Sequence, residues 1–444
     1  MKNLSFFGSL LFSFFVTGAL GQNVGIGIAA PAFKLDVRNG SINTDSVYRI
    51  GGNTVLSVLG FGNTFTGRYS GTDITTGQFN TATGNTSLSN NTTGTGNTAN
   101  GAFSLVVNTT GNFNTATGNL ALNSNTIGGY NTATGVASLR ANESGSYNTA
   151  SGFHALYSNT TGIYNTATGV DALRENTEGS YNTATGVEAL KNNISGDFNT
   201  ADGYLALFYN QGGVQNTAVG QRAMFSNVSG GGNTAIGYLA LANNQIGGYN
   251  VAVGYAADVN PATITNAISL GADATVTAGN TARFGNAGTV SYGGYAGWTN
   301  ISDGRFKKNI QENVPGLGFI NKLRPVTYTL DATRLDAFYH NNDKGKTLLS
   351  KEFKAVFETA LQEKEKIIYT GFIAQEVEAA AKQLGFDFSG VDAAKNENDT
   401  YGLRYAEFVV PLVKAVQEQQ VMIEALQKQN ELLQQRIAQV ETKN

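Results

Sequence analysis

The chain has 444 residues, of which 55 are glycine and 14% are charged, with a formal net charge of −3 and a pI near 5.6. This composition is too rich in glycine and too poor in charge for an average enzyme, although a hydrophobic fraction of 41% suffices for a core. The acidic balance argues against a nucleic-acid partner, and the lack of cysteine excludes disulfides and thiolate metal sites.

Residues 1–21 are predicted to be a signal peptide. Lys2 supplies the positive charge, residues 4–16 are apolar, and residues 19–21 (Ala-Leu-Gly) have small side chains at the two positions that a signal peptidase reads. A transmembrane anchor is the alternative, but it needs about 20 apolar residues, more than this stretch contains. We therefore expect a mature chain that begins at Gln22 and is secreted or exposed at the cell surface, with no transmembrane segment.

A repeat of 17 residues dominates the middle of the chain. Asn recurs twelve times at this spacing from Asn63 to Asn250, and each copy has Gly four residues later. In ten copies an apolar residue, usually Leu, follows eight residues after the Asn, and a second Asn and a second Gly follow at eleven and fourteen. Asn and Gly tolerate tight turns, so each copy can hold two short strands but no helical hairpin. The pattern predicts a solenoid of stacked rungs, each hydrogen-bonded to the next.

Stacking has consequences for the core and for assembly. Asn at the same corner of every rung can form a hydrogen-bonded ladder. At about 4.8 Å per rung, the shaft would be about 55–60 Å long. One large aliphatic residue and one or two small ones per rung make a thin core, and trimerisation would bury a second face and protect the sheet edges.

The repeats from Asn63 to about Gly285 resemble the head repeats of trimeric autotransporter adhesins. The shared motif is Asn-Thr-Ala-x-Gly, and after Asn250 the spacing shortens to the 14 residues that separate Asn266 from Asn280. The resemblance implies a left-handed parallel β-roll in a homotrimer, with a surface glycan or another host-surface or cell-surface molecule as its ligand. The 17-residue period differs from those heads.

The shaft offers little chemistry of its own. Its acidic residues are scattered, and His154 occupies a slot that other copies fill with Asp171 or Glu188. Two carboxylates at one height could imitate a glycosidase pair. Solvated loop residues that vary between copies are the interpretation we favour.

A different composition begins near residue 300, after a linker at 291–301. Four sequence blocks follow in order: Ser302-Asp303-Gly304-Arg305-Phe306-Lys307, Leu323-Arg324-Pro325-Val326-Thr327-Tyr328, Gly371-Phe372-Ile373-Ala374-Gln375-Glu376-Val377 and Tyr401-Gly402-Leu403-Arg404-Tyr405. Together they resemble the endosialidase-type intramolecular chaperone, the self-cleaving serine peptidase domain at the end of phage tail spikes. The resemblance implies Ser302 as nucleophile and Lys307 as general base, with Asp303 and Arg305 in support. Residues 332–366 are predicted to be a family-variable insertion.

The residues themselves are compatible with this chemistry. A serine hydroxyl needs a base, and the only histidines, His154 and His340, lie far from Ser302 in sequence. A lysine becomes a base when burial lowers its pKa from about 10.4 toward 7–8. Five residues separate Ser302 from Lys307, so the chain has to turn between them for the side chains to meet. The alternative is that Ser302-Asp303 is only a helix cap that precedes a basic face.

The C-terminal segment carries a heptad pattern. Val416, Ile423, Asn430 and Ile437 recur every seven residues, and Leu426, Leu433 and Val440 follow three residues after the last three. This seam predicts a coiled coil over 413–442, with a surface amphipathic helix as the alternative. Ile and Leu at these positions favour dimers in model peptides. We expect a trimer because both family resemblances imply one.

The expected fold is a mainly β solenoid, a trimeric parallel β-roll, followed by a small α+β chaperone domain and a coiled coil. The predicted segments are a signal peptide (1–21), a leader (22–62), the repeat shaft (63–290), a linker (291–301), the chaperone and peptidase domain (302–412) and the coiled coil (413–442). The expected function is that of a secreted adhesin-like or tail-fibre-like trimer whose chaperone drives assembly and is released by Ser-Lys autoproteolysis. It would act once per chain, on no substrate in trans and without metal or cofactor.

Two alternatives stay open. In the first, the protein is an adhesin or glycan-binding spike that keeps the chaperone as a permanent trimerisation cap. In the second, it cleaves glycans in the loops of the shaft. The short uniform rungs leave no room for a catalytic insertion, which counts against the second alternative.

Overall fold

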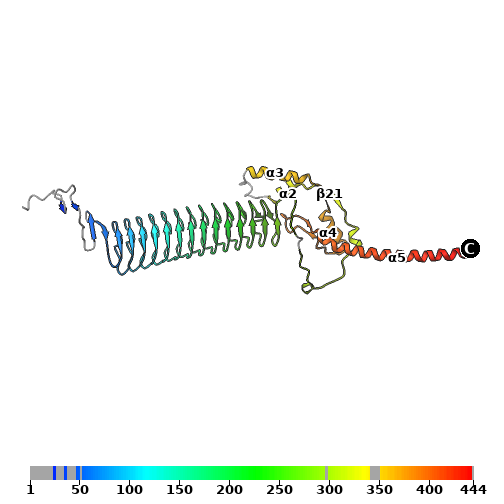
Figure 1. Ribbon diagram of the computed structural model, residues 1–444, viewed down its shortest axis with the longest axis horizontal. Coiled ribbons are helices and arrows are strands. Elements are labelled where there is room, and N and C mark those ends of the chain that lie inside the picture. The colour runs from blue at the N-terminus through cyan, green and yellow to red at the C-terminus, as the bar shows by residue number, and fades with distance from the viewer. Residues whose placement is uncertain are drawn as a thin grey trace, which may run out of the picture.

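The computed structural model describes residues 24–26, 35–37, 47–50, 53–295, 299–340 and 351–442. Figure 1 shows a long shaft, a smaller domain at its C-terminal end, and one helix that extends beyond that domain. The predicted signal peptide lies outside the described residues, as do residues 296–298 of the linker and 341–350 of the insertion.

The shaft is a β-solenoid with one short strand per rung. The leader contributes β1 (Val24–Ile26), β2 (Leu35–Val37), β3 (Val47–Ile50) and β4 (Asn53–Ser57), and the rungs contribute β5 (Thr64–Thr66), β6 (Thr81–Thr83), β7 (Thr98–Asn100), β8 (Thr115–Thr117), β9 (Thr132–Thr134), β10 (Thr149–Ser151), β11 (Thr166–Thr168), β12 (Thr183–Thr185), β13 (Thr200–Asp202), β14 (Thr217–Val219), β15 (Thr234–Ile236), β16 (Val251–Val253), β18 (Ile268–Leu270) and β20 (Ala282–Phe284). Strands β3 to β16, β18 and β20 form one 16-stranded sheet. From β5 onward the neighbours in this sheet are parallel. The predicted solenoid is thereby confirmed.

The sequence predicted two short strands per rung, but from β5 to β16 the structure has a strand on only one side of each rung. Leu173 has φ 50°, in the left-handed region, and its buried side chain fills the core opposite Ala167. The backbone nitrogen of Leu173 still donates to Ala189 O in the next rung, at 3.0 Å. The second side therefore keeps the rung-to-rung ladder but turns too tightly to be a strand.

A buried asparagine ladder fixes the corner of the rungs. The side-chain nitrogen of Asn165 donates to Gly179 O at 2.8 Å, and its Oδ1 accepts from the backbone nitrogen of Asn182 at 3.0 Å. The backbone nitrogen of Asn165 donates to Asn148 Oδ1 at 2.9 Å. Each side chain thus satisfies backbone groups of its own rung and of the next, as the repeat predicted.

A second ladder runs beside the first. Asn176 Nδ2 donates both to Asn159 Oδ1 and to Gly179 O, each at 2.9 Å. A Cβ on Gly179 would lie 2.5 Å from Asn176 Oδ1 and 2.6 Å from Gly196 O, so only glycine fits at this corner.

The rungs change near the base of the shaft. Strand β18 pairs with β20 at an offset of 14 residues, Ile268 opposite Ala282, and Asn266 Nδ2 donates to Asn280 Oδ1 at 2.8 Å. Two further short strands, β17 (Asp258–Val259) and β19 (Thr275–Val276), pair in parallel on another side of these rungs. The shortened spacing expected after Asn250 is therefore present.

A small mixed α/β domain follows the shaft. Its elements are the 3₁₀ helix η1 (Gly304–Phe306), α1 (Leu317–Ile320), β21 (Val326–Tyr328), α2 (Ala332–Tyr339), α3 (Lys351–Glu365), β22 (Tyr369–Gly371), α4 (Ala374–Lys382), β23 (Val391–Asp392), β24 (Gly402–Leu403) and the 3₁₀ helix η3 (Tyr405–Phe408). Its core is built around the buried side chains of Phe319, Val377, Phe388 and Phe408.

The helix α5 (Val409–Glu441) has 33 residues and includes the predicted heptads. The exposed fractions of its seam side chains are 62% for Val416, 48% for Ile423, 59% for Leu426 and 57% for Ile437. A helix is confirmed here, whereas the coiled coil stays a prediction because it requires a partner helix. Among the described residues, no helix combines the length and the apolar character needed to cross a membrane.

The asparagine ladder generates a testable prediction. Asn165→Ala would leave the buried backbone nitrogen of Asn182 without its acceptor and would remove one of the two side-chain donors to Gly179 O. An orphaned buried group costs about 1–3 kcal/mol. We expect a clearly lower urea midpoint by circular dichroism. The matched control is Thr166→Ala, an exposed change on the neighbouring residue that should shift stability by less than about 0.5 kcal/mol. Equal midpoints for the two variants would contradict the ladder's role.

Candidate functional site

The structure brings Ser302 and Lys307 together. Lys307 Nζ lies 2.8 Å from Ser302 Oγ, within hydrogen-bonding distance. The single turn of η1 makes this possible, because the backbone nitrogen of Lys307 donates to Gly304 O at 3.2 Å and reverses the chain. The two side chains are thus placed as a nucleophile and its base would be, and their catalytic roles stay a prediction.

Asp303 and Arg305 interact with one another beside the dyad. Asp303 Oδ1 caps the turn by accepting from the backbone nitrogen of Arg305 at 2.9 Å, and the guanidinium lies 2.6 Å from Oδ2. These two hydrogen bonds, the side-chain one first, hold the pKa of Asp303 below its ordinary value of 3.8. Their evident effect is to shape the turn that joins Ser302 to Lys307.

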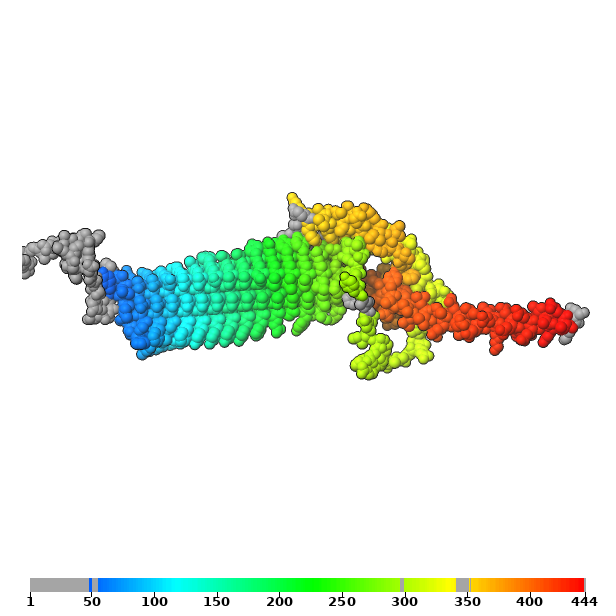
Figure 2. All heavy atoms as spheres, viewed as in Figure 1, coloured from blue at the N-terminus to red at the C-terminus, as the bar shows by residue number. Residues whose placement is uncertain are grey.

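The segment that carries the dyad is open to solvent. Ser302 and Lys307 are both exposed, and the exposed fractions of three apolar neighbours are 93% for Ile301, 75% for Phe306 and 75% for Ile310. In Figure 2 the yellow-green part of the chain stands away from the body of the molecule below the end of the shaft. One chain therefore assembles the pair without burying it.

The remaining sequence blocks are joined by the antiparallel pairing of β21 with β22 and by side-chain hydrogen bonds. Arg324 Nε donates to Glu376 Oε2 at 3.0 Å, joining the second block to the third, and this hydrogen bond lowers the pKa of Glu376. The backbone nitrogen of Phe372 donates to Tyr405 Oη at 3.1 Å, joining the third block to the fourth. A Cβ on Gly371 would collide with that hydroxyl, so a larger residue here would displace the Tyr405 side chain and break this hydrogen bond.

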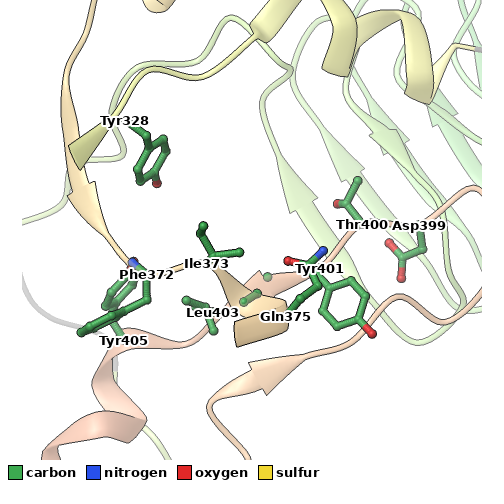
Figure 3. A pocket seen from close by; sticks show the side chains of 11 residues that line it. Tyr328, Phe372, Ile373, Gln375, Asp399, Thr400, Tyr401, Leu403 and Tyr405 are labelled. Atoms are coloured by element: carbon green, nitrogen blue, oxygen red, sulfur yellow. The ribbon is translucent and has the colours of Figure 1, made fainter. Parts of the chain in front are cut away.

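These blocks also line a cavity of about 630 Å³. Figure 3 shows Phe372 and Tyr405 side by side with Tyr328 above them, and Asp399, Thr400 and Tyr401 on the opposite side. Burial, and then the nearby Tyr405 and Tyr369, raise the pKa of Tyr328. Neither Ser302 nor Lys307 lines this cavity. In the sequence analysis these aromatic residues served only to identify the resemblance to a family. The sequence did not predict that they line one cavity.

A second cluster was missed by sequence reasoning. His340 Nε2 lies 3.1 Å from Asp273 Oδ1 in the shaft, and His340 Nδ1 lies 3.0 Å from Asp336 Oδ1 in α2. One ligand-type atom from each residue lies within 4.8 Å of the other two, so the set could hold a divalent cation. The two ring nitrogens also lie within hydrogen-bonding distance of other groups, Nδ1 at 2.9 Å from the backbone oxygen of Asp336 and Nε2 at 3.1 Å from Thr275 Oγ1, so the cluster is held together without a cation.

Two acidic residues of the shaft, Asp171 and Glu188, lie beside basic neighbours. Lys191 Nζ is 2.6 Å from Glu188 Oε1 and 3.7 Å from Asp171 Oδ2, and His154 Nδ1 is 3.5 Å from Asp171 Oδ1. These contacts link adjacent rungs across the surface. These side chains are only 17–26% exposed, so they form partly buried ion pairs between rungs and are less solvated than the sequence suggested.

The chain was compared with known proteins. Residues 302–386 match the family model described as the chaperone of endosialidase. None of the curated proteins that were searched matches the chain. The matched region begins at Ser302, includes the first three sequence blocks and ends before the fourth, so the predicted resemblance is confirmed for this part of the chain.

The turn beside the dyad can be tested by titration. Arg305→Gln removes the guanidinium that lowers the pKa of Asp303, so that pKa should rise toward 3.8. Because the pKa is lowered in the folded chain, the pair supports the turn above about pH 4 and ceases to do so as the pH falls further. Carboxyl NMR on protein labelled at aspartate would follow the change, with Lys308→Gln as the control. An unchanged Asp303 titration in Arg305→Gln would contradict the assigned cause.

Proposed function

Since the chain carries a chaperone-of-endosialidase domain at the end of a β-solenoid shaft, we propose that it is a secreted or cell-surface trimeric fibre that cuts itself near Ser302. The chaperone domain would direct assembly, and the cut would follow. The observation that carries the proposal is the contact of 2.8 Å between Lys307 Nζ and Ser302 Oγ, at the first residues of the matched region. The predicted signal peptide supports export.

The proposed chemistry uses only these two side chains and water. Lys307, as the neutral amine, takes the Oγ proton of Ser302 while Oγ bonds to a neighbouring backbone carbonyl carbon. The C–N bond of that peptide breaks, and its nitrogen takes the proton from the Lys307 ammonium. Water then hydrolyses the ester on Oγ, which leaves a carboxylate end and restores the serine hydroxyl.

Assembly would switch this chemistry on. A lysine acts as a base only as the neutral amine, a form that burial favours. In one chain Lys307 is exposed, and Ile301, Phe306 and Ile310 beside it present apolar surface to water. Partner chains that cover this surface would bury the dyad with it. The cut would then occur only in the assembled protein.

Two further features support association between chains. The apolar seam of α5 lies open along a helix about 50 Å long, a length that suits a coiled coil. On the sheet, the outward residues change from Thr166 and Thr168 in the middle of the shaft to Ile268 and Leu270 near its base. Apolar residues on an open sheet face favour packing against another chain close to the chaperone domain.

An adhesin or glycan-binding spike with a retained chaperone is the second candidate. Its supporting observation is a column of aromatic rings on the shaft, in which Tyr130, Tyr147, Tyr164 and Tyr181 stack at 4.8–5.1 Å and are each about half exposed. Exposed aromatic faces are suited to stacking on sugar rings. A screen for glycan binding and for released product would separate this candidate from a glycan-cleaving spike.

The dyad is tested by intact mass. Wild-type protein should yield a shaft fragment ending near residue 301 and a separate C-terminal fragment. Ser302→Ala and Lys307→Met should remain uncut at full length, because each removes one partner of the proton transfer. The matched control is Lys308→Met, which changes the adjacent exposed lysine and should cut like wild type. Cutting of Ser302→Ala would overturn the proposed nucleophile.

The dependence on assembly is tested on α5. Ile423→Asp combined with Leu433→Asp places charges on the apolar seam, so the chains should stay separate in light scattering and should remain uncut. The control pair is Gln420→Asp with Gln434→Asp, two exposed positions outside the seam, which should assemble and cut. Normal cutting by a monomeric seam variant would contradict the switch.

A further inference from the structure

The described part of the 332–366 insertion packs against the base of the shaft. The ring of Phe353 in α3 lies 4.4 Å from that of Tyr255, between centroids. Phe357 and Leu361 of the same helix share a buried cluster with Ala287. Figure 1 shows α2 and α3 beside the last rungs, and the shared clusters establish the contact. The insertion therefore has an apolar face that is already occupied by the shaft.

Polar contacts surround this apolar face. Asn260 Nδ2 donates to Tyr339 O at 2.9 Å, and Lys364 Nζ donates to Thr289 O at 2.6 Å. Burial in this interface lowers the pKa of Lys364. From the later loop at 396–399, Asn396 Nδ2 donates to Thr277 O, and Asp399 accepts from the hydroxyl of Thr277, each at 2.8 Å.

The buried cluster of His340, Asp273 and Asp336 lies within this interface. The side chains of His340 and Asp273 are only 5% and 1% exposed, and Thr275 Oγ1 lies 3.1 Å from His340 Nε2. Arg283, in the last strand β20, stacks over the ring of Tyr339 at 4.3 Å. The histidine and the two carboxylates match one another across this interface, so the contact between clamp and shaft is specific as well as apolar.

We propose that α2, α3 and the 396–399 loop form a clamp that keeps the C-terminal fragment bound to the shaft after the chain is cut. The proposal rests on the proposed self-cleavage only because that cleavage is the event after which the clamp would hold the fragment. Every shaft residue in these contacts precedes Ser302 and every clamp residue follows it, so a break at Ser302 leaves all of them in place. Cleavage and release are then two separate events, and the partner of the clamp is the base of the cut shaft.

The fold gives a reason for such a clamp. A solenoid exposes unpaired backbone at its last rung, and terminal rungs usually need a cap. Here Lys364 Nζ donates to Thr289 O, shortly after the last strand β20, and Asn396 Nδ2 donates to Thr277 O, directly after β19. The clamp therefore protects the end of the shaft, and its loss after cleavage would expose that end.

The clamp can be tested without relying on self-cleavage. In full-length Ser302→Ala protein, a recognition site for a specific protease is inserted after Gly294, and the chain is cut there by the added protease. The C-terminal fragment should co-elute with the shaft in size exclusion. His340→Leu combined with Phe353→Ser should weaken that association at least tenfold, and the control pair Arg334→Ala with Glu358→Ala, both exposed on the same helices, should not.

Three results would overturn the clamp. The first is that the two fragments separate although the clamp is unmodified. The second is that the fragments of the His340→Leu and Phe353→Ser protein associate as tightly as those of the unmodified clamp. The third is that EDTA alone releases the fragment, which would mean that a bound cation holds the surfaces together. Failure of the proposed autoproteolysis would be seen separately, as an uncut wild-type protein, because here the added protease makes the break.

Discussion

The shaft depends on buried asparagine side chains that are hydrogen-bonded through both the amide nitrogen and the amide oxygen. Each rung contributes only a leucine and one or two alanines to the core, such as Leu173 with Ala167 and Ala172. That core is too thin to fix the rungs by packing alone. Asn165 and its equivalents bind backbone groups of two successive rungs, so a shift of one residue in any rung would leave buried polar groups without partners. With a period of 17 residues, each asparagine side chain lies within hydrogen-bonding distance of backbone groups in its own rung and in the next.

A shaft fixed in this way defines the position of everything after it. Where the asparagine ladder ends, Asn250 Oδ1 accepts from the backbone nitrogen of Ala267, and the spacing then falls to 14 residues. The sheet face becomes apolar over the same rungs, and the clamp helices cover their other side. The chain then leaves the shaft, and the Ser302–Lys307 pair lies in an exposed segment shortly afterwards. The base of the shaft thus serves both as the end of the solenoid and as the platform for the chaperone domain.

Sequence reasoning recovers what repeats or lies close together in the chain. The rung spacing, the asparagine ladder, the buried leucines and the turn between Ser302 and Lys307 all follow from local patterns. The second side of each rung was predicted to be a strand. Its leucines have a positive φ, as Leu173 does, and nothing in the sequence indicates that backbone conformation at a leucine. The contact of His340 with Asp273 joins two distant segments, and no pattern in either segment predicts it. The coiled coil depends on a partner chain, so its heptads remain a prediction.

The central claim is that the dyad is complete in one chain and becomes reactive only when other chains bury it. Acylation of lysine amines in Ser302→Ala protein, followed by peptide mass spectrometry, tests this claim most directly. The account predicts that Lys307 is modified in separated chains and protected in the assembled precursor, whereas the exposed neighbour Lys308 is modified in both. Equal modification of Lys307 in the two states would show that assembly leaves the dyad in water, and the proposed switch would be wrong.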